Sequence, residues 1–425
     1  MDVKRALVLS GGGSRGAYEI GAWRALRELG VRLDGVYGTS IGALNAALVA
    51  RGDLEAAVAI WQGIDLSSII AVPKGESFAI DHMISNKRDV IPFLLENVRR
   101  LGVDITPLQN LVRAECDEGR IRASGMALGV MTFRVPQMQG VPMRLRDMKD
   151  GALGDWIIAS ASCFPIFPAR VIAGQRYIDG GYYDNLPIDM ALRDGADEVI
   201  AVELRPDPVH PEYARMPWLT EIRPRHSLGG FLDFNPKLMA RSLRLGYQDA
   251  MKRFGRFEGW RYTFRRIDDL SILPQARRYA KRLNSFDAEF MRRGAIYAGQ
   301  PVNAPLTQAL ESETESAALA WKDIWLRGLE LVAEVMGYRV DAIYPPADLI
   351  GQARTYCRAQ GENLRLDESA LHAAWKAGQR QTFALLTAWL DRNGEFPQEL
   401  LRRLGELPKE TAAALFLHTL DVMGA

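Results

Sequence analysis

The first 42 residues constrain the fold more than any other stretch of this chain. An apolar strand pattern over Arg5–Ser10 runs into a glycine-rich turn, Gly11–Gly16, and a helix pattern follows. A second short strand pattern ends at Gly38-Thr-Ser-Ile-Gly42, before another helix pattern. Strands that alternate with helices in this way indicate an α/β layer structure.

The second turn, Gly38 to Gly42, matches the Gly-x-Ser-x-Gly pattern of a nucleophile elbow. In such a turn the flanking glycines avoid side-chain clashes while the serine hydroxyl is held out at the sheet edge. The pattern alone is weak, because glycine and serine are common residues. Here an Ala- and Leu-rich helix pattern follows over Ile41–Ala50, so strand, turn and helix come in the required order. Ser40 is therefore the candidate nucleophile.

The first turn has two interpretations. The spacing Gly11-x-Gly13-x-x-Gly16 also matches a dinucleotide-binding fingerprint, and Asp34 follows at about the expected distance. In a dinucleotide fold that acid ends the second strand, whereas Asp34 precedes the short segment that leads into the elbow. We therefore favour an oxyanion hole, formed by backbone N–H groups from Gly11 to Gly13 near a helix N-terminus, with Gly12 and Gly13 as the main donors.

Composition sets the broad class of the protein. The 425 residues, 48% hydrophobic and 25% charged, are enough for a full core and two domains. Because 53 Lys and Arg residues oppose 52 Asp and Glu residues, we expect no nucleic-acid partner. The chain enters a strand at once and has no apolar run of membrane-spanning length, so we expect neither a signal peptide nor a membrane span.

The three cysteines bear on the cellular location of the protein and on metal binding. Cys116, Cys163 and Cys357 lie far apart and lack metal-ligand spacing. We expect a cytoplasmic protein that uses no metal and no organic cofactor.

The middle of the chain continues the α/β pattern. The segment Trp156–Pro168 is rich in small residues and ends at two prolines. Phe164 and Phe167 in this segment are candidates for the wall of an acyl pocket, with core packing as the alternative. A strand pattern then ends at Asp179-Gly-Gly, which suits a carboxylate aimed into a site but also a plain turn. A buried strand pattern over Glu198–Leu204 supports a doubly wound sheet.

Two further segments each allow two interpretations. Residues 72–112 alternate helix-like runs with polar breaks, and are either a lid over Ser40 or a surface helical insertion. Residues 251–293 hold twelve Lys or Arg and five Asp or Glu, a balance of +7. They form either a solvated helical face or a peripheral contact with an anionic membrane surface.

The last third of the chain is helical by pattern. Apolar residues recur at spacings of three and four, as a buried stripe requires. They are Trp321, Trp325, Leu329, Val332 and Met336, and later Leu371 and Trp375, with Gly378 at the same spacing. We expect a catalytic domain over residues 1–257 and a helical C-terminal domain of unknown role over residues 258–425.

Four blocks in order resemble the patatin-like phospholipase family: Gly11–Gly16, Gly38–Gly42, Ala159–Pro168 and Asp179–Gly181. The resemblance covers residues 5 to 205. It implies a three-layer doubly wound sheet with helices on both faces, and a Ser-Asp dyad in which Asp179 is the general base for Ser40. It also implies an oxyanion hole from Gly11, Gly12 and Gly13.

The resemblance bears on substrate binding as well. It places a basic residue at Arg15, which either meets a lipid phosphate or holds the loop through a salt bridge. Cys163-Phe164 departs from the smaller residues of the family, and this departure bears on the shape of the acyl pocket and not on the chemistry.

The histidines of the chain bear on which residue is the general base for Ser40. None of the five lies in a motif with glycines, although the order Ser, Asp, His leaves His210 or His226 open as a third member. An aspartate serves as base for a serine if desolvation makes it more basic and a strong oxyanion hole carries most of the barrier reduction. The apolar stretch around Phe164 and the three glycines meet both needs, so we predict Asp179.

These interpretations together predict a serine acyl hydrolase that cleaves carboxylic esters of phospholipids or lysophospholipids through an acyl-enzyme on Ser40. The alternative from another class is a nucleotide-binding or protein-interaction module that keeps the fold without catalysis.

Overall fold

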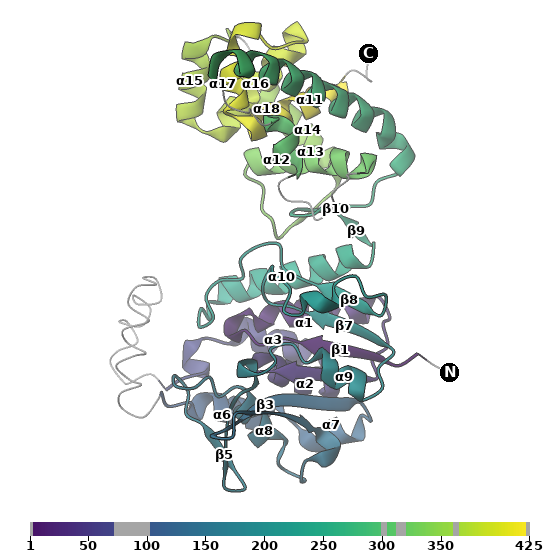
Figure 1. Cartoon of the computed structure of the whole chain (residues 1–425), viewed down its shortest axis with the longest axis vertical. Coiled ribbons are helices and arrows are strands. Elements are labelled where there is room, and N and C mark those ends of the chain that lie inside the picture. Colours follow the sequence, from purple (N-terminus) through teal and green to yellow (C-terminus); the bar gives the residue numbers. More distant parts are fainter. Residues whose placement is uncertain (1–2, 72–102, 299–303, 312–319, 360–364, 422–425) are drawn as a thin grey trace. The chain divides into compact units, whose positions relative to one another are not determined.

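The structure is a computed structural model, and it describes residues 3–71, 103–298, 304–311, 320–359 and 365–421. Residues 72–102, the larger part of the segment considered as a lid, lie outside the described residues. The chain divides into two compact units, Met1–Phe254 and Gly255–Ala425 (Figure 1).

An eight-stranded mixed sheet forms the centre of the first unit, with strand order β5-β6-β3-β2-β1-β7-β8 and β4 paired to β3. The strands are β1 Arg5–Leu9, β2 Gly35–Thr39, β3 Ala127–Val135, β4 Gln139–Arg144, β5 Arg170–Ile172, β6 Gln175–Asp179, β7 Glu198–Val202 and β8 Leu219–Ile222. The run from β3 through β2, β1 and β7 to β8 is parallel, and β4, β5 and β6 pair antiparallel. The chain winds outward in both directions from β1, as a doubly wound sheet does.

Helices cover both faces of this sheet. They are α1 Ala17–Glu28, α2 Ile41–Arg51, α3 Leu54–Gly63, α6 Thr106–Glu115, α7 Glu118–Ala123, α8 Leu153–Ser160, α9 Ile188–Arg193 and α10 Pro236–Arg253. Ile188 and Met190 of α9 pack with Ala6 and Val8 of β1. Since side chains alternate along a strand, Leu7 of the same strand faces the opposite layer. There α2 packs on the sheet and α10 lies alongside α1 (Figure 1). The predicted fold class is confirmed.

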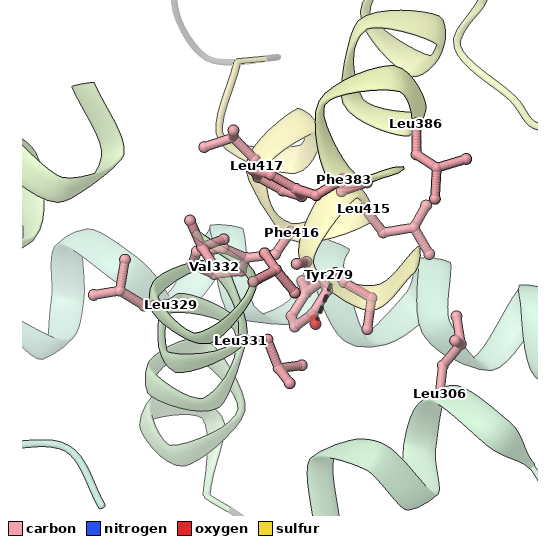
Figure 2. Close-up of a cluster of buried hydrophobic side chains, with 14 of the residues drawn as sticks. Tyr279, Leu306, Leu329, Leu331, Val332, Phe383, Leu386, Leu415, Phe416 and Leu417 are labelled. Carbon is pink, nitrogen blue, oxygen red and sulfur yellow. Dashed lines mark hydrogen bonds between the residues drawn. The ribbon is translucent and has the colours of Figure 1, made fainter. Parts of the chain in front are cut away.

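The second unit is mainly helical. Its helices are α11 Asp269–Ala298, α12 Pro305–Glu311, α13 Trp321–Val335, α14 Pro346–Ala359, α15 Glu368–Ala377, α16 Gln379–Asn393, α17 Leu401–Gly405 and α18 Pro408–Asp421. Short strands β9 Phe257–Glu258, β10 Thr263–Arg265 and β11 Ile343–Tyr344 form a separate sheet. Tyr279, Phe383 and Phe416 lie within the apolar core of the second unit, and the Tyr279 hydroxyl donates to the Ala412 carbonyl at 3.1 Å (Figure 2).

The predicted apolar stripes of this unit hold in part. Trp325, Leu329 and Val332 are buried on one face of α13. Trp321 and Trp375 are 43% and 57% exposed, so their assignment to the core is wrong. Trp321 is the first residue of α13, where a side chain has fewer packing neighbours, and the Arg277 guanidinium lies over its ring instead.

Candidate active site

Ser40 stands on a sharp turn between β2 and α2. Its backbone has φ 55° and ψ −124°, a conformation that residues other than glycine rarely adopt. Backbone strain of this kind concentrates at functional sites. A Cβ atom at Gly38 would lie 2.1 Å from the Gly42 carbonyl oxygen, and one at Gly42 would lie 2.5 Å from the Leu9 carbonyl oxygen. Both flanking positions therefore require glycine, which is the geometry of a nucleophile elbow.

The backbone around Ser40 is held by its neighbours. The Ser40 amide donates to Oγ of Ser160 at 2.8 Å, and the Ser160 hydroxyl donates to the Met131 carbonyl at 2.6 Å. The Thr39 hydroxyl donates to the Asp184 carbonyl at 2.9 Å. These bonds fix the strained residue from both sides.

The sheet topology brings Ser40 and Asp179 together. Strand β3 lies between β2 and β6; it pairs Met131 with Thr39 in parallel, and Thr132 with Asp179 in antiparallel register. The ends of β2 and β6 therefore meet on adjacent residues of β3. The Gly181 amide donates to the Asp179 carboxylate at 2.8 Å, and the nearby Ser40 side chain acts to lower the pKa of the same carboxyl.

Burial makes Asp179 a stronger base than an ordinary aspartate. The side chain is buried, and desolvation raises the pKa of Asp179 to about 6, although hydrogen bonds from Gly181 and Ser40 act in the opposite direction. Burial likewise raises the pKa of the nearby Cys163 thiol to about 11, so this cysteine is protonated at neutral pH. This pKa does not favour Cys163 as a candidate nucleophile.

The glycine loop, Gly11 to Gly13, lies beside Ser40: a Cβ atom at Gly11 would be 3.1 Å from the Ser40 Cβ. The Gly11 amide donates to the Asn185 carbonyl at 3.0 Å, so this predicted oxyanion donor is occupied. Within the described part of the chain the Gly12 and Gly13 amides donate to no protein group. These two amides lie at the start of the 3₁₀ turn Gly13–Gly16, a position where backbone N–H groups can accept an anion as partner.

Arg15 braces the loop rather than projecting freely. Its Nε donates to the Gly229 carbonyl at 3.0 Å, and the Ser14 hydroxyl donates to the Gly230 carbonyl at 2.8 Å. Burial and the proximity of Arg205 lower the pKa of Arg15. Of the two roles considered for Arg15, these contacts favour the structural one, with a backbone carbonyl in place of a salt bridge.

A small apolar cavity of about 30 Å³ adjoins Ser40. Its lining residues are Gly13, Ser40, Ile41, Leu44, Ile69, Leu108, Val112, Ile157, Ala161, Cys163, Phe167, Phe231, Leu232 and Phe234. Phe167 is buried and lines this cavity, whereas Phe164 is 50% exposed and takes no part in the lining. Phe231, Leu232 and Phe234 could not be predicted as lining residues, because they lie in an irregular segment without periodicity.

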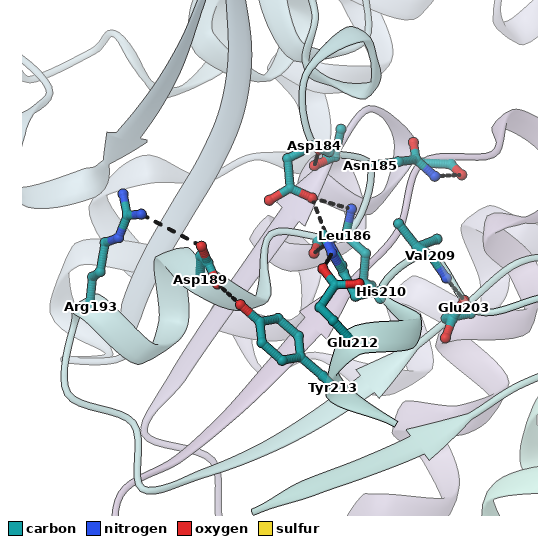
Figure 3. A network of polar contacts seen from close by, with 12 residues as sticks. Asp184, Asn185, Leu186, Asp189, Arg193, Glu203, Val209, His210, Glu212 and Tyr213 are labelled. Atoms are coloured by element: carbon teal, nitrogen blue, oxygen red, sulfur yellow. Dashed lines mark hydrogen bonds and ion pairs between the residues drawn. The ribbon is translucent and has the colours of Figure 1, made fainter. Parts of the chain in front are cut away.

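His210 belongs to a different network (Figure 3). Its Nδ1 lies 2.9 Å from Glu212 Oε1, and its Nε2 lies 3.0 Å from Asp184 Oδ1 and 3.1 Å from the Leu186 carbonyl. The hydrogen bond with Asp184 is the main cause that raises the pKa of His210 to about 9. Both ring nitrogens are thus engaged, which disfavours His210 as a third member of a triad.

The described residues contain no group of three His, Cys, Asp or Glu side chains that could hold a metal ion. The three cysteines are free thiols. Over the same residues, no helix has both the length and the apolar character needed to cross a membrane.

The site therefore places an elbow serine near a buried carboxylate, beside two backbone amides without a protein acceptor, on a doubly wound sheet. Residues 7–192 match the family model of the patatin-like phospholipases. This match confirms, over residues 7–192, the resemblance predicted from the sequence.

Named relatives agree with this family. The chain is 29% identical over 205 residues to the patatin-like phospholipase domain-containing protein 7 of Rattus norvegicus, covering 47% of this chain and 13% of that protein. It is 28% identical over 204 residues to Lysophospholipase NTE1 of Mycosarcoma maydis, covering 47% of this chain and 9% of that protein. The matched region thus spans a small part of each relative.

Among solved structures, VipD from Legionella pneumophila matches with a TM-score of 0.40 and 15% identity, covering 94% of this chain and 93% of that chain.

Proposed function

We propose that this protein is a serine acyl hydrolase that cleaves carboxylic ester bonds of phospholipids or lysophospholipids. The observation that carries the proposal is that strand β3 brings Ser40 on its strained turn next to the buried Asp179 carboxylate, beside the Gly12 and Gly13 amides, which have no protein acceptor. An apolar cavity next to the serine suits the start of an acyl chain.

The reaction follows from this geometry in two steps. Asp179 removes the Ser40 proton while Oγ attacks the ester carbonyl carbon, and the Gly12 and Gly13 amides donate to the oxyanion that forms. When the tetrahedral intermediate collapses, the alcohol part leaves with the proton from Asp179, and the acyl group stays on Ser40. A water then gives a proton to Asp179 and attacks the acyl-enzyme; the fatty acid leaves and Ser40 recovers the proton.

The raised pKa of Asp179 serves this mechanism. A carboxylate with a pKa of about 6 accepts a proton more readily than an ordinary aspartate, yet it is still ionised at neutral pH.

A fluorophosphonate probe tests the proposal, because labelling requires an activated serine. We expect labelling of the full chain that is lost in Ser40→Ala, and turnover of p-nitrophenyl esters that survives a chelator. His210→Ala and His226→Ala should keep kcat/KM within about tenfold, less than a general base contributes. Absence of labelling in the folded protein would instead favour the non-catalytic binding module.

We also propose that residues 1–257 act as the catalytic domain of a cytoplasmic protein, with residues 258–425 as a separate helical domain. The supporting observation is that Ser40, Asp179 and the glycine loop all lie within the unit that ends at Phe254. A chain ended at residue 258 should keep esterase activity and change its lipid preference or oligomeric state. Loss of activity in a folded truncation would show that the helical domain helps to build the site.

Peripheral membrane contact through residues 251–293 is a separate question. Arg292 and Arg293 form ion pairs with Glu289, and Arg282 donates to the Gly394 carbonyl. Part of the positive charge of residues 251–293 is therefore engaged by groups of the second unit. These contacts favour the solvated-face interpretation. Co-sedimentation with anionic and neutral vesicles distinguishes the two, since only membrane contact predicts salt-sensitive binding to the anionic ones.

A further inference from the structure

A three-residue segment, Asp184 to Leu186, connects the two halves of the site. Its first residue accepts the Thr39 hydroxyl on its carbonyl at 2.9 Å, directly before the nucleophile. Its second residue, Asn185, binds Gly11 twice. The Asn185 carbonyl accepts the Gly11 amide at 3.0 Å, and the Asn185 side-chain Nδ2 donates to the Gly11 carbonyl at 3.1 Å. Both backbone polar groups of Gly11 are therefore held by one residue.

The Asn185 carboxamide fits between two glycines. A Cβ atom at Gly11 would lie 2.4 Å from Asn185 Oδ1, and one at Gly181 would lie 2.9 Å from the same oxygen. Gly181 in turn donates its amide to Asp179. The Asn185 side chain thus lies between the glycine loop and the turn that supports the proposed base, in a space that exists only because both neighbours lack a side chain.

A second layer holds this segment from outside (Figure 3). Asp184 Oδ1 accepts the Leu186 amide at 3.0 Å and lies 3.0 Å from Nε2 of His210, which is also 3.1 Å from the Leu186 carbonyl. This layer touches neither Gly11 nor the Asn185 carboxamide. It offers variants in the same network that leave the Asn185 contact with Gly11 in place.

We propose that Asn185 is a positioning residue for the oxyanion donors. By fixing both the amide and the carbonyl of Gly11, it sets where the next two amides, those of Gly12 and Gly13, point relative to Ser40. The inference rests on the proposed ester hydrolysis. Its consequence is specific: the contact improves binding of the tetrahedral oxyanion and leaves binding of the planar ester unchanged, so it affects kcat and not KM.

The test compares Asn185→Ala and Asn185→Asp with the control Asp189→Asn. Alanine removes the whole carboxamide, and aspartate keeps its shape but cannot donate to the Gly11 carbonyl. Asp189 lies in the polar network of Figure 3, four residues after Asn185 in the chain, and its carboxylate accepts a hydrogen bond from the Tyr213 hydroxyl. We measure kcat and KM with a p-nitrophenyl ester and the inhibition constant of an alkyl trifluoromethyl ketone, which forms a tetrahedral oxyanion on the serine.

Loss of positioning should lower kcat of both Asn185 variants about 10- to 100-fold, the range that a displacement of up to about 1 Å causes. KM should stay within about twofold, and the ketone should bind more weakly by the same factor as kcat. The Asp189→Asn control should match the unsubstituted protein. This pattern supports the inference, because a merely structural role does not link kcat to ketone affinity.

Three results would overturn it. One is unchanged kcat in folded Asn185→Ala; another is a kcat loss with ketone affinity intact. The third is loss of the folded state in both Asn185 variants, which would make Asn185 a stability residue. Failure of the proposed function looks different, because the unsubstituted chain would then neither turn over esters nor react with a fluorophosphonate.

Discussion

Replacement of Asp179 by asparagine should abolish activity and stabilise the fold. Burial raises the pKa of this carboxyl from its ordinary 3.8 to about 6. A difference of about 2 pKa units corresponds to about 3 kcal/mol, at about 1.4 kcal/mol per unit. This is the free energy that the folded protein loses at neutral pH by keeping a buried carboxylate ionised, and a neutral amide of the same shape avoids the loss. The figure is an upper bound, since the amide cannot match both hydrogen bonds of the carboxylate.

The sign of the pH dependence follows from linkage. The folded state binds this proton more tightly than the unfolded chain, so the stability of the unsubstituted protein falls as pH rises from about 4 through about 6 and is then level. The Asp179→Asn variant does not titrate there. Its advantage should therefore be small near pH 4, about 1.5 kcal/mol near pH 5 and at most about 3 kcal/mol at pH 7.5.

Urea unfolding followed by tryptophan fluorescence at pH 5 and pH 7.5 measures this advantage. Asp150→Asn is the matched control, because the Asp150 side chain is 96% exposed and its replacement should shift neither curve. In parallel, kcat/KM of Asp179→Asn should fall by about 10² to 10⁴, the contribution of a general base. The reasoning is refuted by a variant that gains equally at both pH values, that is less stable at pH 7.5, or that keeps activity within tenfold.

Three further predictions concern the loop, the pH profile and the histidine. Gly12→Ala should fold, because its Cβ would meet the flexible Leu204 side chain at 2.6 Å, and it should lose turnover. Gly13→Ala should lower the melting temperature, since Gly13 has φ +60° and its Cβ would lie 2.1 Å from the Phe231 carbonyl oxygen. Melting curves and kcat of both variants test this prediction, and equal melting temperatures would contradict it. The kcat/KM of the unsubstituted enzyme should fall as pH drops through about 6, because protonated Asp179 cannot act as a base; a flat profile between pH 5 and 8 would count against this base. The pKa of His210 is raised to about 9, mainly by its hydrogen bond with Asp184. The stabilisation of the folded protein by protonated His210 is therefore complete below about pH 6.5 and is lost as pH rises through about 9. The urea midpoints of the unsubstituted protein and His210→Gln should differ at pH 6 and converge at pH 10, and a constant difference would show that charge is not the cause.

The elbow and the glycine loop could be predicted from the sequence because their requirements are local. A strained serine needs glycines at fixed offsets, and a backbone turn into a helix needs them next to the strand, so the residue pattern alone points to Ser40. The same local logic places Asp179 at a strand end. That logic cannot say which carboxylate meets which serine, since Ser40 and Asp179 are distant in the chain.

Only the tertiary structure decided that pairing, and it did so through β3. Because β2 and β6 flank β3 with Thr39 opposite Met131 and Asp179 opposite Thr132, the two strand ends meet at one point of the sheet. Contacts of this kind depend on strand order and register, which leave no periodic trace in the residues that make them.

The same reason explains the residues that the sequence misjudged or missed. Phe164 and Phe167 belong to one apolar run, yet the fold buries only Phe167. Gly11 shares its motif with Gly12, yet its amide donates to Asn185, which lies 174 positions away in the chain. Composition and spacing determine which backbone turns are possible, whereas the use of each polar group depends on the distant segment that packs against it.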